Sequence, residues 1–137
     1  MRAFHHSLVI LLVMACKPPD DAAVVRCENH PSSTKALMTC RLEAKRVSES
    51  TSAPFSTESS NEIVHVQGQL SLATGSAKVE VLGTRGAVQT LTLTAGQPIT
   101  IDADVPVVRA SRNFRVGFTP LAPDTTGLSG SVEHFAR

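Results

Sequence analysis

Apolar and polar residues alternate along most of the chain after Glu62, and this period of two restricts the possible folds more than any other feature. One face of the segment 64–72 carries Val64, Val66, Gly68, Leu70 and Leu72. Successive side chains of a β-strand point to opposite faces of the sheet, so the pattern predicts a strand with one buried face. The pattern returns, with glycine- or proline-containing turns between the repeats, in the segments 78–82, 88–94, 99–105, 113–118 and 128–135.

The rest of the chain favours the same class of fold. An alternating strand is also predicted over 36–47, where the polar positions are mostly charged and should face water. No segment after the first fifteen residues carries the 3.6-residue apolar stripe of a helix, so we expect little helix. Short strands joined by tight turns pack as antiparallel sheets face to face. We therefore predict an all-β fold, a small antiparallel β-sandwich of the jelly-roll or immunoglobulin-like type.

The segment 48–61 is different in composition, with eight Ser or Thr among its fourteen residues. Such a composition buries little apolar surface and predicts a loop. Phe55 lies inside this segment. We interpret Phe55 as a pin that attaches the loop to the sandwich, and the alternative is an exposed contact residue.

The N-terminus begins with Arg2, followed by an apolar run of eight residues, 8–15, that ends at Cys16. The run has the length of a secretory signal and is far shorter than the roughly 20 residues of a membrane-spanning helix. Its end, Val13-Met14-Ala15-Cys16, resembles the lipobox of bacterial lipoproteins, with an aliphatic residue three positions before the cysteine and a small residue directly before it. The resemblance implies that Cys16 is acylated and becomes the first residue after cleavage. The alternative is an ordinary signal-peptidase site after Ala15.

The lipoprotein resemblance also implies a location. Two or three acyl chains on one residue give stable membrane attachment, whereas one chain is marginal. Lys17 occupies the position at which an aspartate would signal retention in the inner membrane, so the resemblance implies a lipid-anchored envelope protein at the outer membrane. We expect a signal peptide over 1–15, a lipidated N-terminus and tether over 16–25, and a β-sandwich domain over 26–137.

The three cysteines of the chain are Cys16, Cys27 and Cys40. An odd number leaves one thiol unpaired in an oxidising compartment, whereas acylation of Cys16 leaves an even pair. We therefore predict a disulfide between Cys27 and Cys40, a cross-link worth about 3 kcal/mol in the chain-entropy description. A zinc site that combines these two cysteines with His30 lacks a fourth ligand and the tight paired spacing of such sites, so we predict no metal there.

Charge gives no reason to expect nucleic acid as a partner, because 13 basic residues oppose 12 acidic ones and removal of Arg2 leaves 12 against 12. Asp102 and Asp104 share one predicted strand face. Calcium requires six to eight oxygen ligands, and no ligand-rich loop surrounds the two aspartates, so we interpret them as a solvated strand face.

Other candidates for chemistry have simpler explanations. His30, His65 and His134 lack the spacing of metal ligands, and we expect all three at the surface or at an edge. Serines are abundant, but no G-x-S-x-G motif is present, and the segment GTRG lacks the lysine of a phosphate loop. We predict no catalytic, cofactor-binding or metal-ligating residue, no cofactor, and a chain that is not an enzyme.

Two functional hypotheses remain. The segment FRVGFTP followed by GLSGSVE resembles the jelly-roll or immunoglobulin-like accessory modules of exported bacterial proteins, over about half the chain, and this resemblance transfers no functional residue. The first hypothesis is a structural or interaction domain that contacts the membrane through lipid on Cys16 and meets an envelope protein. The alternative is a small-molecule or carbohydrate-binding lipoprotein.

The two hypotheses predict different surfaces. The lack of Trp and Tyr counts against the second, because sugar rings commonly stack on aromatic side chains. A flat polar surface with one exposed strand edge would favour the interaction domain. A concave patch with Phe55 exposed, or with converging polar loops, would favour ligand binding.

Overall fold

The computed structural model describes residues 23–29, 38–57, 62–107 and 112–136, and in these residues it contains strands and no helix. Within this described part, nothing helical is long and apolar enough to cross a bilayer. The signal peptide, Cys16 and His30 lie outside the described residues. The strands are β1 (Val24–Asn29), β2 (Met38–Arg46), β3 (Thr51–Ser56), β4 (Ile63–Ser71), β5 (Ser76–Gly83), β6 (Gly86–Thr94), β7 (Ile99–Pro106), β8 (Asn113–Pro120) and β9 (Thr126–Ala136).

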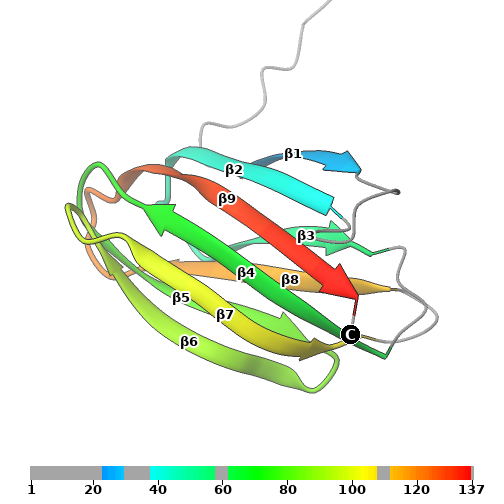
Figure 1. The fold of residues 1–137 in the computed structure, drawn as a ribbon. Helices are drawn as coiled ribbons and strands as arrows, with labels where there is room; N and C mark the ends of the chain where they lie inside the picture. Colours follow the sequence, from blue (N-terminus) through cyan, green and yellow to red (C-terminus); the bar gives the residue numbers. More distant parts are fainter. Residues whose placement is uncertain (1–22, 30–37, 58–61, 108–111, 137) are drawn as a thin grey trace, which may run out of the picture.

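The strands form two antiparallel sheets that face each other (Figure 1). Sheet A has five strands in the order β1-β2-β9-β4-β7, and sheet B has four in the order β3-β8-β5-β6. Apart from the hairpins β1–β2 and β5–β6, every connection passes from one sheet to the other. This strand order is that of a jelly roll, so the predicted all-β sandwich is confirmed and its topology is the jelly-roll one.

The core lies between the sheets, where most apolar residues of the strands are buried. On β4, for example, Val64, Val66 and Leu70 are buried, whereas the residues between them are at least partly exposed. The centre of the core includes the rings of Phe55 and Phe114, which stack with their centroids 5.0 Å apart. The predicted period-two alternation is therefore the pattern that fills the sandwich.

One border of the sandwich is closed by contacts between β6 of sheet B and β7 of sheet A. The backbone N–H of Asp102 on β7 donates to Oε1 of Gln89 on β6 at 3.2 Å. The backbone N–H of Thr84, in the β5–β6 turn, donates to the carbonyl oxygen of Pro106 at 3.0 Å. These hydrogen bonds occupy outward-facing backbone groups of β7, which would otherwise form an open sheet edge.

The centre of sheet A requires a glycine at position 130 on β9. A Cβ atom at Gly130 would lie 2.1 Å from the carbonyl oxygen of Gln69 and 2.6 Å from Cδ2 of Leu70 on β4. Both distances are shorter than any ordinary van der Waals contact, so only glycine allows β9 and β4 to approach this closely.

The prediction of a loop over 48–61 is wrong in its middle part, because β3 occupies Thr51–Ser56. The Ser/Thr-rich composition hides an alternation in which Ala53 and Phe55 point into the core. Pairing with β8 over Thr51–Ser56 supplies the hydrogen bonds that a Ser/Thr-rich segment alone would not form. Tertiary pairing therefore overrides the local preference of these residues.

The predicted boundary between tether and domain at residue 26 also needs correction. Val24 and Val25 belong to β1, and Val25 packs against the core. The strand is short and follows a proline-containing segment, so the sequence pattern alone does not predict it. It forms because β2 provides a paired neighbour along its whole length.

Candidate functional site

The outer face of sheet A is a polar surface built by regular elements. Its central strand, β9, presents Ser129, Ser131 and Glu133 outward, and the neighbouring strands present Arg, Glu, Gln and Thr side chains. The opposite face of the same strands fills the core, so these residues are free to contact other molecules without disturbing the fold. This outer face is the candidate functional site.

A first hollow of about 450 Å³ lies over β1 and β2. Its walls include Arg26 and Glu28 from β1, and Arg41 and Glu43 from β2. Arg26 and Arg41 are directly opposite each other in the β1–β2 pairing. Like charges in this position repel, so the hollow contains an electrostatic cost that no ion pair among the described residues relieves.

A second hollow of about 420 Å³ lies over β2, β9 and β4 and shares Arg41 and Glu43 with the first. Its floor contains the short side chains Ser129 and Ser131, and Gln69 stands on the opposite wall. Small residues on the middle strand with longer ones on both sides produce a groove. The lining includes Leu70 and Pro98 beside its polar side chains and contains no aromatic ring, so the hollow can form hydrogen bonds but offers no stacking surface.

A polar cluster on this face joins His65 of β4 to two aspartates of β7. Nδ1 of His65 lies 2.8 Å from Oδ1 of Asp104, and Nε2 lies 3.1 Å from Oδ1 of Asp102. An imidazole can donate to both neighbours only when both of its nitrogens are protonated. Each ring nitrogen of His65 therefore lies within hydrogen-bond distance of a carboxylate oxygen of β7.

The two aspartates are exposed as predicted, with side-chain exposures of 61% for Asp102 and 43% for Asp104. Their pairing with His65 was not predicted, because it depends on the register in which β4 lies beside β7. The described residues contain no group of three or more His, Cys, Asp and Glu side chains that could hold a metal ion.

The structure contradicts the expected position of His134. It was predicted at the surface or an edge, but it is 1% exposed and points into the core, edge-on to the ring of Phe114 with centroids 5.7 Å apart. Among the described residues its Nε2 has no hydrogen-bond partner, and burial lowers the pKa of the imidazole below its usual 6.5. The signal was present in the alternation, because His134 shares a face with Leu128 and Val132.

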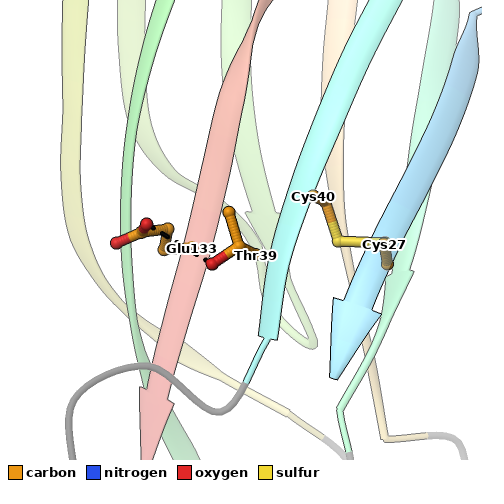
Figure 2. Close-up of a disulfide and its surroundings, with 4 residues drawn as sticks. All are labelled: Cys27, Thr39, Cys40 and Glu133. Carbon is orange, nitrogen blue, oxygen red and sulfur yellow. Dashed lines mark hydrogen bonds between the residues drawn. A yellow bond between two sulfur atoms is a disulfide. The ribbon is translucent and has the colours of Figure 1, made fainter. Parts of the chain in front are cut away.

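The predicted disulfide between Cys27 and Cys40 is present and links β1 to β2 (Figure 2). The two cysteines are directly opposite each other in the strand pairing. Beside them, the hydroxyl of Thr39 donates to Oε1 of Glu133 at 3.4 Å and connects β2 to β9. The disulfide therefore attaches the edge strand β1 to the body of sheet A.

Phe55 is 1% exposed. Its predicted burial against the sandwich is confirmed, although it lies on strand β3 in the core and not on a loop at the surface, and the alternative of an exposed contact residue is wrong. No aromatic contact for a ligand is therefore available at this position.

Comparison with known proteins adds little to this geometry. The chain matches no known family model and no curated protein. Among solved structures it is similar to the Cupin_2 domain of an XRE family transcriptional regulator from Enterobacter cloacae, with a TM-score of 0.41 and 10% identity, over 85% of this chain and 99% of that chain. The jelly-roll assignment rests on the strand order itself.

Proposed function

We propose that this chain is a lipid-anchored protein of the cell envelope whose jelly-roll domain has a non-catalytic structural or interaction role. The observation that carries the interaction role is the polar outer face of sheet A, which ends at the edge strand β1. Phe55 is buried, so it does not form the exposed aromatic contact expected for a ligand-binding surface. A polar face that ends at an edge strand is the kind of surface expected for an interaction domain.

The anchor is proposed from the sequence. The apolar run ends at Cys16, and the segment Val13-Met14-Ala15-Cys16 has the pattern of a lipobox. Pairing of Cys27 with Cys40 leaves Cys16 as the cysteine available for acylation. Lys17 directly after it supports the outer membrane as the location in a Gram-negative cell.

The non-catalytic role is supported by the contacts of the polar side chains on the outer face. Both ring nitrogens of His65 are occupied by aspartates, and Thr39 is bound to Glu133. Ser71 lies with its hydroxyl 3.2 Å from that of Ser129. These groups bond to one another across neighbouring strands, as is typical of a sheet stabilised by cross-strand pairs.

The anchor is tested by labelling cells with a radioactive fatty acid while they express either the wild-type protein or Cys16→Ala. We expect label on the wild-type protein and none on the variant, because the acyl chains would be attached to this sulfur. Ser7→Ala, within the same signal segment, is the matched control and should be labelled like the wild type. Equal label on Cys16→Ala, or no label on any of the three proteins, would contradict the anchor.

The alternative function is binding of a small molecule or a carbohydrate. The second hollow favours it, because Gln69, Ser129 and Ser131 could donate and accept hydrogen bonds from hydroxyl groups. A screen of the purified protein against a glycan array, repeated with Ser131→Arg to fill the hollow, separates the two functions. Binding that is lost in Ser131→Arg would support the alternative and oppose a purely protein-directed role.

A further inference from the structure

The sandwich has four edge strands, and three of them are protected in the part of the chain that the structure describes. β6 and β7 face each other and share the Gln89 hydrogen bond. β3 contains the exposed Pro54, which has no N–H to offer another strand. β1 has no proline, and no described strand pairs with the side of it that faces away from β2 (Figure 1). An edge of this kind is a template for a further strand.

The disulfide shows which backbone groups of β1 point to the free side. The Cα atoms of Cys27 and Cys40 are 4.0 Å apart. In an antiparallel pair, opposite residues that exchange no hydrogen bonds are about 4.5 Å apart, and those that exchange two are about 5.5 Å apart. Cys27 therefore directs its N–H and C=O away from β2. By alternation, the backbone groups of Val25 and Asn29 point the same way.

The outward-pointing backbone groups of β1 could pair with those of β1 in a second copy of the chain, in several antiparallel registers. The charges of Arg26 and Glu28 select one of these registers. If the twofold axis passes through Cys27, Arg26 of each copy faces Glu28 of the other, and Val25 faces Asn29. An axis at position 26 would place two arginines opposite each other, and an axis at position 28 would oppose two glutamates. Only the register centred on Cys27 places opposite charges together at both positions.

A second observation favours a charged partner beside β1. Within one chain, Arg26 is opposite Arg41 on β2, and no ion pair of Arg26 occurs among the described residues. Glu28 is opposite Thr39, which is neutral. Neither charge of β1 therefore has an oppositely charged residue directly opposite it within the chain, and both gain one when two copies pair.

We propose that two copies of this chain associate through antiparallel pairing of their β1 strands about a twofold axis at Cys27. The pairing joins the two five-stranded A sheets into one continuous sheet and makes the two outer faces a single surface. The inference deepens the proposed interaction role by naming a second copy as the partner, and it rests on that role. Anchoring at Cys16, eight residues before Val24, would hold both copies in one membrane and raise their effective concentration.

The test uses the full chain, purified in mild detergent, and measures its mass by sedimentation at several concentrations. We expect a concentration-dependent dimer for the wild type. Arg26→Glu and Glu28→Arg should each weaken the dimer by about tenfold or more, because each places two like-charge pairs across the axis. The double variant Arg26→Glu/Glu28→Arg should restore the dimer. An equal mixture of the two single variants should also restore it, since each supplies the charge that the other lacks.

Two control variants change the net charge equally at positions away from β1. Arg85→Glu lies in the β5–β6 turn and Glu49→Arg lies between β2 and β3, and both residues are exposed. Both should dimerise like the wild type. Neither charge change on β1 is expected to unfold the chain, and far-UV circular dichroism of each variant checks this.

A wild-type protein that stays monomeric at all concentrations would overturn the proposal. A dimer that is insensitive to both single variants would also overturn it, because its interface would lie elsewhere. Fatty-acid labelling of the same preparations separates this failure from that of the proposed function. A labelled monomer contradicts the dimer alone, whereas an unlabelled dimer contradicts the anchor alone.

Discussion

His134 shows, at the scale of a single residue, how a buried ionisable group ties the stability of this core to pH. Its pKa in the folded chain lies below 6.5 because burial disfavours the charged imidazole. In the unfolded chain the ring regains its ordinary pKa of about 6.5. Below that pH the unfolded chain binds the proton more readily, so stability falls as the pH drops through 6.5 toward the folded pKa. Above 6.5 the ring is neutral in both states and has no such effect.

We predict that His134→Leu flattens this dependence. The free energy of unfolding, measured by urea denaturation with far-UV circular dichroism, should fall less for the variant than for the wild type between about pH 7.5 and about pH 5.5. His65→Gln, on the outer face, is the control for a histidine outside the core. Parallel curves for His134→Leu and the wild type would contradict a role for the buried ring.

At the scale of elements, β1 is an edge strand that a disulfide attaches to the sheet. It is bonded to one neighbour, β2, and the Cys27–Cys40 bridge supports that pairing. Edge elements of this kind open locally at lower free energy than central ones. The hydrogen-bonded neighbours on both sides of β9 and β4 hold those strands independently of the bridge.

We predict that Cys27→Ala/Cys40→Ala lowers the free energy of opening β1 by about 3 kcal/mol, the entropy that the cross-link removes from the open chain. Amide hydrogen exchange should show lost protection in β1 and retained protection in β9 and β4. Treatment of the wild type with a reductant provides the matched comparison without any substitution. Equal loss of protection in all three strands would mean that the bridge supports the whole sandwich.

At the scale of the whole molecule, the last strand of the chain completes the fold. β9 lies between β2 and β4 in sheet A, and Met38 of β2 is paired with His134 at the far end of the sequence. Pairing of such distant segments makes folding slow and strongly cooperative. Sheet A cannot close until β9 is in place.

We predict that a chain ending before Thr126 does not fold, because the loss of β9 leaves β2 and β4 without a shared neighbour. Far-UV circular dichroism should show no cooperative urea transition, and the chain should be digested rapidly by a protease. A chain that lacks β1 and all residues before it is the control, since it loses an edge strand alone and should retain a cooperative transition. A cooperative transition in the chain without β9 would contradict the prediction.

Particular residues show how much of the structure could be predicted from the sequence. The exposure of Asp102 and the burial of Val64 follow from alternation, which is a local property of a strand. β3 was missed because Ser and Thr outnumber its inward-facing residues, Ala53 and Phe55. The polarity of His134 predicts exposure, but its place in the alternation, on the same face as Val132, decides its burial.

The sequence by itself determined the class of fold, the pairing of Cys27 with Cys40 and the division between inward and outward faces. These properties depend on the order of residues within short segments and on the number of cysteines. Only the tertiary structure decided that His65 meets two aspartates, that Arg26 faces Arg41 and that no described strand pairs with the outer edge of β1. Those features depend on which strands become neighbours and in which register, and this choice is made by contacts between segments that are far apart in the sequence.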